Sequence, residues 1–538
     1  MTQATNAMLL QALEMMQEGR AGGRVVPNIA ALRQLPAKGS LNAVVLGSQK
    51  IGDNNGGVYW QDIHDKTSAD NGRTIIVAKD GMRWKLAPEG VKAASTSAEG
   101  VSVLKYGAIG DGKHDDSAAI QKALDQNKGG TILIPEGRYL HAGVKLDGTA
   151  YNGTKIICRG EMLLRPRTAE RESNLQGAFV GLIIRNCENI EVHYRGDGNR
   201  KLQSMQEHCF NVAVAGAKNI RFPTFSCREI RGDAVYITQS DLHHESPPAE
   251  KIYFGRFDVE NSEDDGRNAM SIISGKDIVV DDFRSVRVGG KVNVMQPGGF
   301  DIEPNTDFQI VDNVWLKKVY IDTAGNFGLQ CFGKGRNRLG GNVSNLRVDD
   351  FDVRTRCDGR SSALVCFRHC RNITLKGRAV MANPSDGHHV GLMLDNVDGA
   401  KIDMTIQGGL YSALASYEYQ VNAVDVNVTV TGYRRAALAT ASVSNSRFNV
   451  KASNGGRRSS ALYTRSWTNK AIQTNTVYQI DCPQNTTQGD AAAINDTLKS
   501  VRFNGVSFAG GNLTGYTKDK VLVNFDKQVR LKSVRGVM

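Results

Sequence analysis

The chain has 538 residues and a formal net charge of +12, with 40% hydrophobic and 23% charged residues. This length exceeds that of one ordinary compact domain, so we expect two or three units or one elongated array. The two fractions are those of a folded soluble protein and exclude a largely disordered chain. The basic residues form no Lys/Arg block, which argues against nucleic-acid binding, so the excess charge serves solubility or attraction to an anionic glycan.

The nine cysteines include no CxxC pair of the kind that binds zinc or exchanges disulfides. We therefore expect no metal or other cofactor, and interpret most cysteines as small buried residues of a protein that folds in a reducing cytoplasm. No stretch reaches the roughly 18 apolar residues of a membrane span. Glu14 and Glu18 lie where a signal peptide would need its apolar core and cleavage site.

The first elements in chain order are short. Residues 7–19 carry one apolar stripe at helical spacing, which predicts an N-terminal helix within residues 1–23. Residues 24–92 contain short β-like runs separated by Asn, Asp and Gly turns, which predicts a small β domain. Residues 91–99 are rich in Ala, Ser and Thr, as in a linker.

A different pattern begins near residue 100. Asp115 or Asp116 is positioned to cap a helix over Ser117–Gln126, whose apolar face contains Ile120, Ala123 and Leu124. Gly129 and Gly130 then precede a predicted strand, Thr131–Ile134.

An internal repeat governs the middle of the chain. A polar residue followed by an aliphatic residue, any residue and another apolar one recurs about every 20–36 residues, in copies that begin at Asn189, Asn219, Asp277, Asn345, Asn372 and Lys401. A second short strand is predicted between successive copies, at 234–237, 269–272, 301–303, 328–331, 363–367 and 391–394. Short strands and polar turns without helices predict the coils of a parallel β-helix over residues 100–455. A β-propeller would need about 40 residues and four strands per repeat.

One stretch carries a family resemblance. Val101–Tyr139, with its Gly110-Asp111-Gly112 turn, helix cap and Gly-Gly-strand-Pro-Glu-Gly segment, resembles the opening of the pectate-lyase-like β-helix superfamily, especially phage tailspikes and related glycan-degrading enzymes. The resemblance implies an all-β, right-handed parallel β-helix whose N-terminal end is plugged by a helix. Residues 54–87 resemble the small β domain that precedes the β-helix in many tailspikes, where it is associated with virion attachment. For residues 456–538 the resemblance implies a C-terminal β region that helps to hold a homotrimer.

The first candidate catalytic residues are Asp301 and Glu303. They alternate with Ile302, so they share the outer face of a strand, about 6.6–7 Å apart along the chain. Glycoside hydrolysis uses two carboxyls about 5–5.5 Å apart for retention or 6.5–9.5 Å apart for inversion. Two close carboxylates also raise the pKa of one of them, as a general acid requires.

A neighbouring coil supplies further candidates, because adjacent coils lie about 4.8 Å apart. The loop over residues 260–268 offers Asp264 and Asp265 as acids, and Arg267 and Asn268 as substrate contacts. Asp233 precedes an equivalent strand earlier in the chain and is a further catalytic candidate. The structural interpretation of all these acids is that they accept backbone N–H groups and stabilise turns.

His388, His389 and Tyr411 are assigned to substrate contact. If the reaction were a lyase elimination, a histidine and Tyr411 would be the natural base and acid. Adjacent histidines on a strand face opposite sides, so the two cannot easily bind one metal. Other aromatic residues that could stack on sugars are Trp315, Tyr417 and Tyr419.

These observations favour a trimeric phage tailspike that hydrolyses a bacterial surface polysaccharide, either O-antigen or capsule. The N-terminal region would bind a tail or baseplate protein, and the chain would act at the bacterial surface after synthesis in the host cytoplasm. A polysaccharide lyase and a non-catalytic glycan-binding adhesin remain alternatives, because one fold hosts many functions.

Overall fold

The computed structural model describes residues 24–35, 42–50, 53, 56–62, 65–86, 100–167, 173–203, 208–241, 243–290, 298–335, 339–356, 362–382, 389–415, 420–456, 459–464, 471–482, 494–496, 501–504, 506–512, 522–523 and 530–532. The chain divides into two compact units, Met1–Ala98 and Glu99–Met538. The helix expected at residues 7–19 and the linker expected at 91–99 lie outside the described residues.

The N-terminal unit is a five-stranded sheet in the order β1-β2-β3-β5-β4 with one short helix, α2 (Ile29–Leu32). Its strands are β1 (Arg24–Val26), β2 (Asn42–Val45), β3 (Gly57–Asp62), β4 (Ile75–Val77) and β5 (Arg83–Leu86). Trp84 and Tyr59 are buried in its core. Asn28 caps α2 by accepting the N–H of Ala31 at 2.9 Å.

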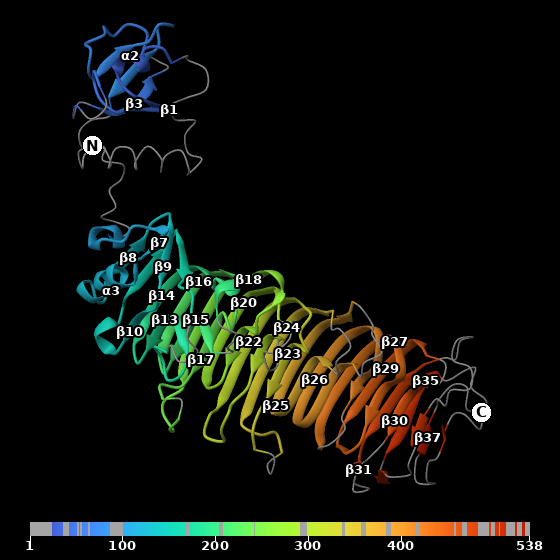
Figure 1. Ribbon diagram of the computed structural model, residues 1–538. Coiled ribbons are helices and arrows are strands. Elements are labelled where there is room, and N and C mark those ends of the chain that lie inside the picture. The colour runs from blue at the N-terminus through green and yellow to red at the C-terminus, as the bar shows by residue number, and fades with distance from the viewer. Residues whose placement is uncertain are drawn as a thin grey trace. The chain divides into compact units, whose positions relative to one another are not determined.

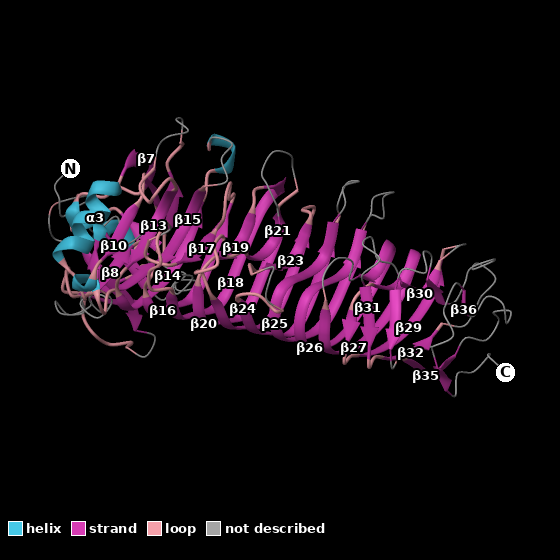
Figure 2. Ribbon diagram, turned by 90° about the horizontal axis from the view of Figure 1, so that it is seen from below, coloured by secondary structure: helices cyan, strands magenta, loops and turns pink. Residues whose placement is uncertain are grey.

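The second unit is a parallel β-helix, with its strands stacked side by side (Figures 1 and 2). The first coils contain β6 (Val101–Ser102), β7 (Asp111–Asp115), β8 (Thr131–Ile134), β9 (Arg138–His141), β10 (Val144–Asp147), β11 (Lys155–Cys158) and β12 (Glu161–Leu164). Short helices in these and the next coils are η1 (Val103–Tyr106), α3 (Ser117–Gln126), η2 (Thr149–Tyr151) and η3 (Arg200–Leu202).

Two parallel ladders run through the middle of this unit. One contains β13 (Phe179–Arg185), β15 (Cys209–Ala215), β17 (Val235–Thr238), β19 (Asn268–Ile272), β21 (Gly298–Ile302) and β23 (Phe327–Phe332). The other contains β14 (Glu188–Asp197), β16 (Lys218–Arg228), β18 (Ala249–Asp265), β20 (Gly275–Val288), β22 (Val311–Thr323) and β24 (Val343–Thr355).

The ladders continue without interruption into longer strands, because β25 pairs with both β23 and β24. These long strands are β25 (Ser362–Met381), β26 (His389–Ala415) and β27 (Val421–Thr440). They are followed by β28 (Val443–Ser444), β29 (Arg447–Gly455), β30 (Ser460–Thr464), β31 (Ala471–Thr474), β32 (Val477–Asp481), β33 (Ile494–Asp496), β34 (Val501–Asn504), β35 (Ser507–Asn512), β36 (Leu522–Val523) and β37 (Arg530–Lys532). Parallel pairing therefore runs past residue 455, where the sequence placed the end of the β-helix.

The polar residue of the repeat has a clear structural role. Asn189 and Asn219 adopt left-handed backbone conformations, with φ of 61° and 54°. Asparagine tolerates this region because its short side chain forms local hydrogen bonds. The Asn219 amide also donates to Oδ1 of Asn189 in the preceding coil at 2.6 Å. The repeated asparagine thus both turns the chain and joins successive coils.

Inward side chains stack in register to form the core. Phe257 lies between Phe225 and Phe283, with ring centroids 4.8 and 4.7 Å away and nearly parallel planes. All three rings are buried. The parallel register places like residues above one another, so each coil covers the apolar surface of its neighbour.

The helix α3 lies at the N-terminal end of the β-helix (Figure 2) and adds three buried residues to its core, Ile120, Ala123 and Leu124. The two candidate capping acids, Asp115 and Asp116, accept hydrogen bonds from different segments. Asp115 accepts the N–H of Ser117 at 3.0 Å. Asp116 instead accepts the N–H groups of Ile109 and Gly110 at 2.7 and 3.0 Å and so fixes the preceding turn.

The described parts of the chain contain no helix long and apolar enough to cross a membrane. The eight described cysteines are free thiols, and all but Cys158 are buried.

Candidate active site

One row of outward-facing residues crosses β17, β19, β21 and β23. The register aligns Tyr236, Ser271, Asp301 and Gln330 in successive coils. The adjacent Ile302 points into the core, as the alternation of a strand requires. Asp301 therefore lies on the outer side of the sheet.

This outer position does not expose Asp301, whose side chain is fully buried. One carboxylate oxygen accepts a hydrogen bond from Nε2 of Gln330 at 2.6 Å, and the other accepts from Nδ2 of Asn268 at 3.2 Å. Glu303 remains 17% exposed. Of the two acids that the sequence paired, only Glu303 is accessible from solvent.

Arg267 connects this region to a third carboxylate. Its Nη1 lies 2.9 Å from Oδ2 of Asp233, and its Nη2 lies 3.9 Å from Oε2 of Glu303. The other oxygen of Asp233 accepts the backbone N–H of Asn268 at 3.2 Å. Five of the residues predicted from the sequence thus form one connected cluster, which we call the Asp301 cluster: Asp233, Arg267, Asn268, Asp301 and Glu303.

The electrostatics of the Asp301 cluster favour a neutral Asp301. Burial, which is the largest cause, and the negative charge of Glu303 together raise the pKa of this carboxyl to about 8, against the opposing effect of Arg267. Asp301 is consequently protonated at neutral pH and can donate a proton. A protonated acid beside a second, more accessible carboxylate is the arrangement that acid/base hydrolysis of a glycoside requires.

Asp264 and Asp265 occupy a different environment. Asp265 accepts from Nη1 of Arg200 at 2.6 Å and from Nη1 of Arg231 at 3.0 Å. Asp264 pairs with Nη2 of Arg356 at 2.5 Å. The loop that the sequence placed beside Asp301 therefore contributes Arg267 and Asn268 to the Asp301 cluster, whereas Asp264 and Asp265 bind arginines from other coils.

The residues proposed for a lyase reaction are only partly described. His389 begins β26 and is fully buried, and His388 lies outside the described residues. The hydroxyl of Tyr411 accepts from Nη1 of Arg435 at 2.6 Å, and the same guanidinium lies 5.4 Å from the centre of its ring.

Of the remaining aromatic candidates, Trp315 lies within the described residues. Trp315 donates to Asp349 at 2.8 Å and has Lys317 and Arg347 at 4.7 and 4.6 Å from its ring centre. Tyr417 and Tyr419 lie outside the described residues.

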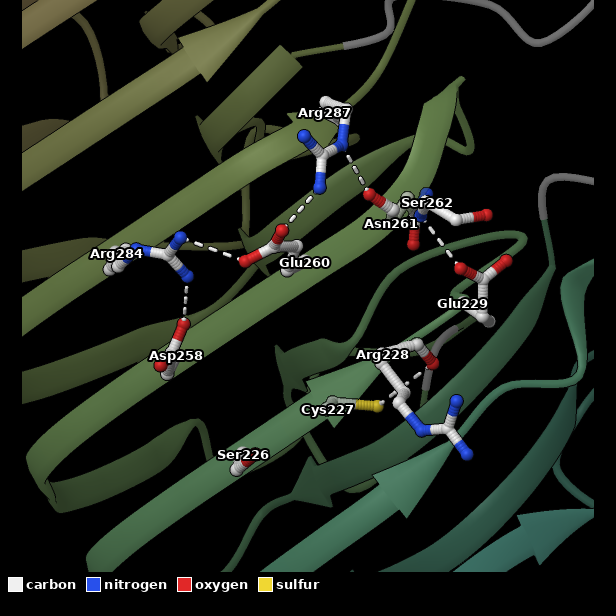
Figure 3. A pocket seen from close by; sticks show the side chains of 10 residues that line it. All are labelled: Ser226, Cys227, Arg228, Glu229, Asp258, Glu260, Asn261, Ser262, Arg284 and Arg287. Atoms are coloured by element: carbon white, nitrogen blue, oxygen red, sulfur yellow. Dashed lines mark hydrogen bonds and ion pairs between the residues drawn. The ribbon is translucent and has the colours of Figure 1, made fainter.

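A pocket that the sequence did not predict lies along β16, β18 and β20 (Figure 3). Its volume is about 390 Å³, and its lining includes three arginines and three acids: Arg228, Arg284, Arg287, Glu229, Asp258 and Glu260. Asp258 and Glu260 alternate with the core residues Phe257 and Val259, so both acids face outward. The one sequence signal for this site was that alternation, and only the register of three coils shows which charges meet.

Among the described residues, no group of three or more His, Cys, Asp or Glu side chains is placed to hold a metal ion.

Two stretches of the chain match known families. Residues 25–89 match a family described as phage tail protein small four-stranded beta-sheet domain. Residues 100–169 match a family described as rhamnogalacturonase A/epimerase, pectate lyase-like. Among curated proteins, 44 residues are 52% identical to the plasmin and fibronectin-binding protein A of Streptococcus pneumoniae, which is 7% of this chain and 6% of that protein. The chain therefore matches only a small part of this relative's length.

Several solved structures are also similar. Tailspike protein gp49 of the Acinetobacter baumannii bacteriophage Fri1, a capsular polysaccharide depolymerase, is 15% identical with a TM-score of 0.34, over 80% of this chain and 75% of that one. The A-module of mannuronan C-5 epimerase AlgE4 from Azotobacter vinelandii is 14% identical with a TM-score of 0.39, over 77% of this chain and 100% of that one. The surface adhesin PfbA of Streptococcus pneumoniae is 12% identical with a TM-score of 0.33, over 81% and 100% of the two chains.

Proposed function

We propose that this chain, a tailspike-type protein of the pectate-lyase-like β-helix superfamily, binds and hydrolyses a bacterial surface polysaccharide through Asp301 and Glu303. The observation that carries the proposal is the pairing of a buried carboxyl, whose pKa is raised to about 8, with a partly exposed carboxylate on the same strand end. Asp301 holds the proton that a leaving sugar oxygen needs. Glu303 is the acid that a substrate can reach, and it activates water or attacks the sugar.

Arg267 is a substrate-binding residue in this proposal. Its 2.9 Å contact with Asp233 fixes the guanidinium, while its 3.9 Å separation from Glu303 exceeds hydrogen-bonding distance. A sugar hydroxyl that enters between Arg267 and Glu303 can accept from the first and donate to the second. For Asp301 to pass its proton to the sugar oxygen, substrate binding must displace the side chains that bury it.

The phage tail domain at residues 25–89 supports attachment of the chain to the virion tail, so the enzyme would act at the bacterial cell surface. We also propose that the chain forms a homotrimer and that residues 456–538 contribute to its assembly.

A non-catalytic adhesin is the second candidate, and the complete burial of Asp301 favours it. Under this alternative the Asp301 cluster serves only to tie three coils together. Hydrogen bonds between buried polar groups of neighbouring coils would be sufficient reason for its presence.

The test compares Glu303→Gln with Asp307→Asn, which removes an exposed carboxylate from the same loop. Purified variants are incubated with capsular and O-antigen polysaccharides, and new reducing ends and binding affinity are both measured. We expect Glu303→Gln to lose about 10²–10⁴-fold in cleavage rate with binding retained, and Asp307→Asn to cleave normally. Normal cleavage by Glu303→Gln would refute the catalytic assignment, and binding without cleavage by the unmodified chain would establish the adhesin.

A further inference from the structure

The pocket along β16, β18 and β20 combines opposite charges at close range (Figure 3). Nη1 of Arg284 lies 2.6 Å from Asp258, and its Nη2 lies 2.8 Å from Glu260. Asp258 and Glu260 are 26% and 39% exposed. These ion pairs are therefore accessible from the pocket and are not sealed beneath it.

Two other charged groups of the pocket, Arg287 and Glu229, form contacts with residues of β18. Arg287 pairs with Glu260 and donates from Nε to the carbonyl oxygen of Asn261 at 2.7 Å. Glu229 accepts the N–H of Ser262 at 2.6 Å. Arg287 and Glu229 have left-handed backbones, with φ of 55° and 49°, a conformation that asparagine adopts at many other corners of this chain.

The third arginine of the pocket, Arg228, is also paired with carboxylates. Arg228 places two nitrogens 2.7 and 2.9 Å from the oxygens of Glu161, and Nη2 lies 2.9 Å from Asp197. Every arginine that lines the pocket thus has a carboxylate within hydrogen-bonding distance. Three arginines and three acids line the pocket, so the formal charge of its wall is zero.

We propose that this pocket is a second carbohydrate site, which binds a neutral, hydroxyl-rich sugar unit of the polysaccharide. A hydroxyl group donates one hydrogen bond and accepts others, so it can bridge a carboxylate and the adjacent guanidinium without separating them. Planar carboxylate and guanidinium groups also offer paired oxygens or nitrogens to neighbouring hydroxyls of one sugar ring. The volume of about 390 Å³ lies within the range of small-molecule sites.

A charged sugar fits this wall less well. A ligand carboxylate beside Arg284 would also lie beside Asp258 and Glu260, and a ligand ammonium group beside either acid would meet Arg284. Each charged ligand group would therefore gain one attraction and face a repulsion of similar range. The net charge of +12 draws anionic material toward the chain as a whole but does not change this local balance.

The inference rests on the proposed polysaccharide binding, but it concerns a different set of residues from the Asp301 cluster. The test fills the pocket without removing a charge. Ser226 is an exposed lining residue, and it shares an outward row with Asp258, Arg284 and, further along, Thr405. Ser226→Trp blocks the pocket, and Thr405→Trp places the same ring on the same row outside it.

The unmodified chain and the two variants are applied to arrays of neutral, carboxylated and amino-bearing oligosaccharides, and dissociation constants are then measured for the glycans that bind. We expect a neutral glycan to bind, Ser226→Trp to weaken it by about tenfold or more, and Thr405→Trp to leave it unchanged. Binding should hardly change between low salt and about 0.5 M salt, where charge interactions are screened within roughly 4 Å.

Equal affinities of Ser226→Trp and Thr405→Trp for every bound glycan would overturn the inference. Binding only to carboxylated or amino-bearing glycans, with an affinity that falls steeply in salt, would overturn the proposal that the ligand is a neutral sugar. If Ser226→Trp does not fold, Asp258→Asn replaces it, with Asp352→Asn as the control from the same row. The catalytic proposal fails separately, through normal cleavage by Glu303→Gln.

Discussion

Replacing Asp301 with asparagine should make the protein more stable at neutral pH while abolishing its proposed activity. Burial raises the pKa of this carboxyl from 3.8 to about 8. Between these values the unfolded chain releases its proton and the folded chain retains it, so the free energy of unfolding falls by about 1.4 kcal/mol for each pH unit. The loss grows to roughly 5 kcal/mol by pH 8, and it is absent below about pH 4, where both states are protonated.

Asparagine cannot ionise, and the site can accept its amide. Oε1 of Gln330 is buried and has no hydrogen-bond partner among the described atoms. A half-turn of the Gln330 amide would let Oε1 accept from the new Nδ2, while the new Oδ1 keeps the bond from Asn268. Asp301→Asn should therefore escape most of the loss that the ionisable side chain imposes.

The assay is thermal unfolding of the unmodified chain and Asp301→Asn at equal concentration, at pH 4.5 and pH 8. The expected gain in Tm is several degrees at pH 8 and close to zero at pH 4.5. Asp233→Asn is the control of opposite sign, because it removes the negative charge that lies 2.9 Å from the buried Arg267 guanidinium, at a cost of about 3 kcal/mol. A Tm difference for Asp301→Asn that does not depend on pH would refute this account of the Asp301 cluster.

Three further changes test other parts of the fold. Burial lowers the pKa of His141 to about 4, so the folded chain resists protonation at this residue and loses roughly 3 kcal/mol of stability as the pH falls from 6.5 to 4. His141→Leu should remove that loss, which is measured by comparing Tm at pH 7.5 and pH 4.5. Asn219→Ala should lower stability by about 1–2 kcal/mol, and Asn219→Gly by less, because glycine accepts the φ of 54°; urea titration of both variants compares them. Phe257→Ala should lower it by about 3–5 kcal/mol by opening the stack between Phe225 and Phe283, measured in the same titration.

The coil architecture could be predicted from the sequence because a local feature repeats. Asn189 and its equivalents mark the same corner in successive coils, and the aliphatic residue that follows each one enters the core. Both properties depend on neighbours in the chain, so periodicity alone reveals them. The end of the ladder was less predictable, because β32 and β35 continue the pairing although the repeated phrase has faded.

The enclosure of Asp301 could not be predicted in the same way. Alternation with Ile302 decides on which side of the sheet a carboxylate lies, but not which side chains cover it. Its hydrogen-bond donors, Asn268 and Gln330, come from the coils before and after. Register across coils is set by the whole stack and is absent from any single segment of sequence.

The dependence on register across coils also explains why the partner of Asp264 and the pocket along β16, β18 and β20 could not be predicted from the sequence. Asp264 pairs with Arg356, 92 residues further along the chain. The charges of the pocket are likewise spread over three coils, and Arg284 meets Asp258 only because β20 lies in register with β18. A list of acids in one loop therefore cannot distinguish a catalytic carboxylate from one that is neutralised by a distant arginine.

The measurement that tests the central claim most directly is the mass of the fragments formed when the chain acts on a purified surface polysaccharide in heavy-oxygen water. Hydrolysis through Asp301 and Glu303 predicts one labelled oxygen for each bond cut, and labelled fragments from Glu303→Gln that form about 10²–10⁴-fold more slowly. Fragments without added water would show an elimination and move the chemistry away from this carboxyl pair. Binding to a polysaccharide that stays intact would contradict the claim that the chain is an enzyme.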